Sequence, residues 1–149
     1  SYAHGGVDTF TADPLTPGAV IWQGELQGIA LGSTVLAQGY IYLSAIGPNG
    51  QEVRYDYGIL PADLPRPSPG GSWEAVATVT SDGAQSTERQ IHSFGQSGSL
   101  TLGTCTWALV PVGIDYGDYD EALLWFPDLG LSVRSGDVVT AITPLSLMP

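Results

Sequence analysis

The sequence predicts an all-β fold, and three features support this. Glycine and proline are frequent, with 20 and 11 of the 149 residues, and turn signals recur about every 8–12 residues. Between the turns, apolar and polar residues alternate with the period of a strand that has one buried face. No segment of useful length has helical periodicity. We therefore expect a single-domain antiparallel β-sandwich, jelly-roll-like, with a closed β-barrel as the alternative.

The chain divides into an N-terminal arm, 1–18, and an antiparallel β domain, 19–149. Asp13-Pro14 and Thr16-Pro17-Gly18 interrupt the first segment, so that it reads as an arm with at most short β pieces. Such an arm packs either on its own domain or on a neighbouring subunit, and the sequence does not choose between the two.

In the first half of the domain, 20–27 alternates as a half-buried strand and 34–46 forms a second, longer one. Gly47-Pro48-Asn49-Gly50 is a hairpin turn, because proline presets its own φ and Asn-Gly tolerates positive φ. The return strand begins at Glu52. Segment 61–72 contains four prolines, which remove ladder donors, and it is expected to be a stiff loop crossing between two sheets.

In the second half, 73–80 is expected to be a strand and 87–94 a shorter strand at an edge. Segment 100–112 is apolar on both faces, which predicts a central strand covered on both sides, with Cys105 as a small buried residue. Segments 121–126, 131–134 and 138–143 complete the set of strands.

The charge excludes two classes of partner. The chain has fifteen acidic residues, four arginines and no lysine, which gives a net charge of −11. Such a surface repels phosphate backbones and anionic lipid, so we expect no nucleic-acid binding and no membrane binding. A single cysteine allows no internal disulfide. The composition fixes no compartment, and an extracellular or virion-like surface is the favoured location.

No catalytic constellation is evident. The only histidines are His4, in the arm, and His92, which we expect to be a strand-edge or semi-buried residue, so a hydrolytic triad is not predicted. Four acidic residues fall on or beside strands, where a barrel interior could bring two of them together, although nothing selects a pair. They are Glu25, Asp56, Glu74 and Glu121.

Loop 113–120, between two apolar segments, has the composition of a recognition surface. Tyrosines give large amphipathic contact area, whereas glycine and aspartate supply adaptability and hydrogen-bond acceptors. The competing interpretation is that these tyrosines only cap the core. The candidate recognition residues are Tyr116, Asp118, Tyr119, Asp120, Trp125 and Trp107.

The same loop offers a candidate calcium site, since carboxylates supply the oxygen ligands that Ca²⁺ prefers. It lacks the glycine and the distal glutamate of an EF-hand, so a solvated acidic loop is the competing interpretation. The candidate ligands are Asp115, Asp118, Asp120 and Glu121. We expect no other cofactor.

Three functional hypotheses follow. The first is a non-enzymatic structural or recognition module, such as a capsid, fibre or decoration subunit or an extracellular binding domain, with self-association or a protein or carbohydrate partner. The second is a small β-barrel that encloses an apolar small molecule and acts, if at all, as a cyclase by folding its substrate. The third is a lectin-like, carbohydrate-binding domain.

Overall fold

The computed structural model describes residues 6–136, 139 and 142, and these form an antiparallel all-β structure. One turn of 3-10 helix, η1 (Pro61–Asp63), interrupts the longest loop. The strands are β1 (Gly6–Ala12), β2 (Ala19–Leu26), β3 (Ile29–Ala37), β4 (Ile41–Ile46), β5 (Glu52–Asp56), β6 (Ser72–Ser81), β7 (Ala84–Phe94), β8 (Gly98–Leu102), β9 (Cys105–Asp115), β10 (Asp120–Phe126) and β11 (Leu131–Arg134).

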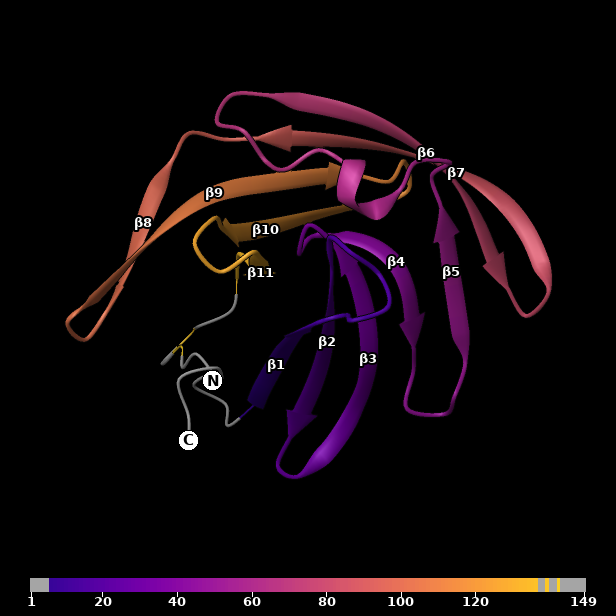
Figure 1. Cartoon of the computed structure of the whole chain (residues 1–149), viewed down its shortest axis with the longest axis horizontal. Coiled ribbons are helices and arrows are strands. Elements are labelled where there is room, and N and C mark those ends of the chain that lie inside the picture. Colours follow the sequence, from indigo (N-terminus) through magenta and orange to yellow (C-terminus); the bar gives the residue numbers. More distant parts are fainter. Residues whose placement is uncertain (1–5, 137–138, 140–141, 143–149) are drawn as a thin grey trace.

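The strands form one 11-stranded sheet that nearly closes into a barrel (Figure 1). Its order is β1-β2-β3-β4-β5-β6-β7-β9-β10-β11, and β8 pairs only with β9. The all-β prediction is confirmed. Of the two arrangements predicted from sequence, the structure has the barrel-like one: nearly every strand pairs with its neighbour in sequence, so the chain does not pass back and forth between two packed sheets as in a jelly roll.

Two register shifts lie in the first half of the sheet. One is between Gln23 and Glu25 in the β2–β3 pair, and the other is between Val35 and Leu36 in the β3–β4 pair. Such bulges bend a strand and increase its twist, which lets a sheet curl toward closure. Gly24 lies at the first shift, and a side chain there would meet the indole of Trp22. The glycine therefore leaves room for that ring.

The predicted single strand 34–46 is wrong, because the chain reverses within it to form β3 and β4. Gln38 and Gly39 have φ values of 53° and 82°, which is the left-handed conformation of a tight hairpin turn. The backbone carbonyls of this turn accept hydrogen bonds from β10 and β11. Trp125 Nε1 donates to Gln38 O at 2.8 Å, and Ser132 Oγ donates to Gly39 O at 2.7 Å. These bonds fasten the β3–β4 turn to the last strands.

The predicted hairpin at 47–50 is confirmed. Gly50 has a φ of 81°, and β4 pairs with β5 from Ser44 opposite Arg54 to Ile46 opposite Glu52. The proline-rich segment 61–72 is a loop as predicted, but it does not connect two sheets. Its Leu64 is buried in the core, and Tyr40 donates to Pro65 O at 2.6 Å. The loop therefore covers one end of the barrel.

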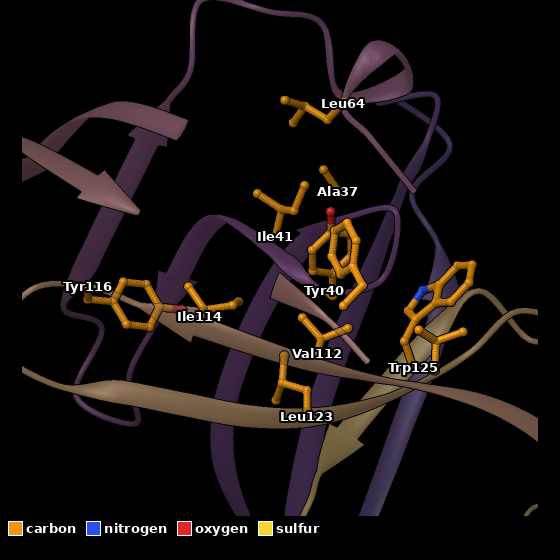
Figure 2. Close-up of a cluster of buried hydrophobic side chains, with 11 residues drawn as sticks. Ala37, Tyr40, Ile41, Leu64, Val112, Ile114, Tyr116, Leu123 and Trp125 are labelled. Carbon is orange, nitrogen blue, oxygen red and sulfur yellow. The ribbon is translucent and has the colours of Figure 1, made fainter. Parts of the chain in front are cut away.

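The core lies inside the curled sheet (Figure 2). Val112 and Ile114 of β9 and Leu123 and Trp125 of β10 contribute alternate side chains, as expected where one face of each strand is buried. The central aromatic ring is that of Tyr40, which is 1% exposed. The other buried members are Ala37, Ile41, Leu64, Phe94, Val110 and Tyr116.

The prediction of a central strand at 100–112 is wrong. Only the second half of β9 lies within the barrel, paired with β7 and β10, whereas its first half pairs with β8 alone. The two form a hairpin that projects from the barrel (Figure 1), and Cys105 near its tip is exposed rather than buried. The apolar residues of segment 100–112 lie on one face of the β8–β9 hairpin and on one face of the barrel part of β9. The segment is therefore not a strand buried on both faces.

The predicted edge strand 87–94 is only partly at an edge, since β7 pairs with β6 throughout and with β9 over Ile91 to Phe94. The sequence left open whether segment 1–18 packs on its own domain or on a neighbouring subunit. The described part packs on its own domain, because β1 pairs with β2 from Gly6 to Ala12. The predicted strand 138–143 lies outside the described residues, apart from Val139 and Ile142. Among the residues described, there is no helix long and apolar enough to cross a membrane.

Candidate functional site

A cavity of about 380 Å³ lies between the inner faces of β1 to β4 and those of β10 and β11. Its walls are mostly apolar. Phe10 of β1 and Trp22 of β2 are direct register partners, and Leu36 of β3 and Leu123 of β10 are each 8% exposed. The alternation of each strand places these side chains inside the barrel. Leu31, which also lines the cavity, is 44% exposed.

Glu121 is the centre of a hydrogen-bond network in the cavity wall. The Tyr42 hydroxyl donates to its Oε2 at 3.1 Å, and the Tyr116 hydroxyl donates to its Oε1 at 3.0 Å. Burial, and then the nearby carboxylate charge, raise the pKa of both tyrosines well above the ordinary value. Both hydroxyls therefore remain protonated and act as donors to Glu121.

The network continues from Tyr42 into the barrel wall. The Tyr57 hydroxyl donates to the backbone carbonyl of Tyr42 at 2.7 Å. Gln90 is 1% exposed, and its amide nitrogen lies 3.4 Å from the Tyr57 hydroxyl and 2.9 Å from Glu88 Oε1. Because a carboxylate only accepts, this last bond fixes the orientation of the Gln90 amide.

His92 ends this chain of groups. Its Nε2 lies 2.9 Å from Gln90 Oε1, and because that oxygen is an acceptor, Nε2 carries the proton. Nδ1 is buried and has no hydrogen-bond partner among the described residues. The ring packs between Trp73 and Tyr40, with centroid distances of 4.9 and 5.6 Å. Burial lowers the pKa of His92 to about 4, so the imidazole is neutral at pH 7.

The structure separates the candidate recognition residues. Tyr116 is buried at one end of the core cluster and Trp125 at the other (Figure 2), while Trp107 lies in the projecting β8–β9 hairpin. Tyr119 is 59% exposed and stacks on Tyr116, with ring centroids 4.7 Å apart. Asp118 and Asp120 are exposed beside it. Only the residues of the β9–β10 turn lie together.

The candidate calcium ligands do not converge. Glu121 turns into the cavity wall, whereas Asp115 Oδ1 accepts from Gly117 N at 2.8 Å in a local turn. Across the part of the chain that the structure describes, no group of three or more His, Cys, Asp or Glu side chains is placed to hold a metal ion. Alternation explains the divergence, because neighbouring strand residues point to opposite faces.

Two of the four strand carboxylates named from the sequence, Glu25 and Glu121, do line the cavity. Asp8 lines it as well, and sequence reasoning missed it because it lies in the predicted arm. The other two face outward: Glu74 pairs with Arg89 through two bonds of 2.9 Å, and Asp56 accepts from Gly58 N at 2.8 Å. Arg134, which is exposed, is the one cationic side chain among the described residues of the lining.

Comparison with known proteins finds no matching family model, no similar curated protein and no similar solved structure.

Proposed function

We propose that the barrel interior binds a small, largely apolar molecule. The observation that carries this proposal is the cavity of about 380 Å³ between β1–β4 and β10–β11. Ligand pockets typically span ~300–1,000 Å³ and combine apolar walls with a few placed polar groups. The cavity has this composition, with Phe10, Trp22 and Leu123 in its walls and Glu121 as a fixed polar group.

The proposal is tested by filling the cavity. Thr34 lines it from β3, while the next residue, Val35, does not. We expect Thr34→Phe to weaken binding of the uncharged dye Prodan at least about tenfold, because the added ring takes up volume that a ligand needs. Dye fluorescence measured against protein concentration gives the affinity.

Val35→Phe is the matched control, since it adds the same ring on the opposite face of the same strand and should leave dye binding unchanged. Circular dichroism checks that both variants fold. If the unmodified protein binds no Prodan, or Thr34→Phe binds it as well as Val35→Phe, the cavity is not a binding site.

We also propose self-association through the β8–β9 hairpin, on a separate observation. The register pairs Leu100 with Trp107 and Leu102 with Cys105, so these four side chains share one face. Thr101 and Thr106 lie on the other face, joined by a 3.0 Å hydrogen bond. No charged residue occurs between Arg89 and Asp115. Two copies of a chain with net charge −11 can thus meet here with little charge repulsion.

We expect the full chain to be a dimer or larger by light scattering coupled to size-exclusion chromatography, and Leu100→Thr/Trp107→Thr to be a monomer. Removing two half-buried apolar side chains takes away the contact that excludes water. Thr101→Val, on the other face, is the control and should keep the mass of the unmodified protein. A monomeric unmodified protein at micromolar concentration would rule out this interface.

A further inference from the structure

From the hydrogen bonding of the cavity lining, we infer that the ligand carries a hydrogen-bond donor that is positively charged, and that the site selects an organic ammonium ion with an apolar chain. This inference rests on the proposed binding function. It specifies the polar group of the ligand, which the apolar walls alone do not.

Three hydroxyl groups of the cavity lining are committed as donors. Tyr42 donates to Glu121 Oε2, Tyr40 to Pro65 O, and Ser132 to Gly39 O at 2.7 Å. A hydroxyl has a single proton to donate, so these three groups have only acceptor capacity left for a ligand. These three groups can therefore take part in binding only as acceptors, which suits a ligand that donates hydrogen bonds.

Glu121 is held in position to accept such a bond. Its two oxygens have about four lone-pair sites between them, and the two tyrosine hydroxyls occupy one on each oxygen. Those two bonds fix the carboxylate without saturating it. An ammonium group that reached Glu121 would form a charge-assisted hydrogen bond, which is about twice as strong as a neutral one.

The charges around the cavity favour the same ligand. Among the described residues that line it, Glu25 and Glu121 are acidic and Arg134, which is exposed to solvent, is basic. The rings of Phe10, Trp22 and Tyr42 also line it, and aromatic faces attract organic cations. The chain's net charge of −11 adds a long-range attraction for cations. A carboxylate ligand would meet the like charges of Glu25 and Glu121 here.

Three ligands with the same eight-carbon chain test the inference. Octylammonium, octanol and octanoate are titrated separately against the protein with bound Prodan, and displacement is followed by fluorescence. We expect octylammonium to displace the dye at about tenfold lower concentration than octanol, because its bond to a carboxylate is charge-assisted. Octanoate should be the weakest of the three.

Glu121→Gln is expected to remove the advantage of octylammonium and to leave octanol unchanged. Glu74→Gln is the matched control, because it removes the same charge from the outer face and should keep the preference. If Glu121→Gln does not fold, the ranking of the three ligands on the unmodified protein still decides the matter.

The outcomes separate the two proposals. If Prodan binds and all three ligands displace it equally, the cavity binds apolar molecules and the selectivity for ammonium is wrong. If octanoate displaces best, Arg134 governs the site and the inference is likewise overturned. If Prodan does not bind at all, the proposed binding function itself fails.

Discussion

Replacing Gly39 by alanine is expected to lower the free energy of unfolding by about 4 kcal/mol, the sum of backbone strain and overpacking. Gly39 has a φ of +82°, which L side chains rarely adopt. An added Cβ would also overlap the carbonyl oxygen of Gly130 and lie 2.8 Å from Leu131 Cα. Both neighbours are backbone atoms, so they cannot move aside as a flexible side chain would.

Gly50→Ala provides the control for this prediction. Gly50 has nearly the same φ, +81°, but a Cβ there meets nothing within 4 Å. We expect that variant to lose only the strain, about 1 kcal/mol. Urea unfolding followed by tryptophan fluorescence measures both. Equal losses would show that the β3–β4 turn does not pack against the turn between β10 and β11.

Acidification from pH 6.5 to 4 is expected to lower stability by about 3 kcal/mol through His92 alone. Its pKa is about 4 in the folded protein and ~6.5 in the unfolded chain. Between these values the unfolded state binds a proton that the folded state does not, so stability rises with pH over this window. Well above pH 6.5 the imidazole is neutral in both states, and the effect is absent.

His92→Phe isolates this contribution, since it replaces the imidazole by a ring that does not titrate and leaves every acidic residue in place. The variant has a cost that does not depend on pH, because Gln90 Oε1 loses its donor. We expect the stability of the unmodified protein to fall more steeply toward pH 4 than that of the variant. Parallel curves of unfolding free energy against pH would contradict the buried, neutral histidine.

Turns could be predicted from the sequence where the conformational preferences of the turn residues themselves determine the turn. Asn49-Gly50 is a strong hairpin signal, and it forms the expected turn, with Gly50 at a φ of 81°. Asp82-Gly83 is a signal of the same kind between the expected strands 73–80 and 87–94, and Gly83 has a φ of 78°. Gln38-Gly39 was missed because glutamine is a weak turn residue and apolar residues continue on both sides. That turn is stabilised by distant partners, Trp125 and Ser132, which sequence periodicity does not reveal.

The cavity depends on barrel closure, and so it lay beyond the reach of local patterns. Glu121 was one of four equivalent strand carboxylates in the sequence, and what distinguishes it is the pair of hydroxyls from Tyr42 and Tyr116. Tyr42 is 79 positions away. Tyr116 is only five positions away, and it was interpreted as part of a surface loop because its flanking residues are polar. The alternation of the strands indicated which faces are apolar, but not which faces meet.

The hydrogen bonding between β7 and β9 has a consequence for how this chain tolerates change. Phe94 pairs with Val112, and Gly95 N donates to Pro111 O at 2.8 Å, so the sheet is continuous across the point where the chain leaves it for β8. The β8–β9 hairpin therefore resembles an insertion into the sheet. Its length can vary without shifting the register of any strand pair in the barrel. A foreign peptide grafted at its tip should therefore be displayed without loss of the cavity between β1–β4 and β10–β11.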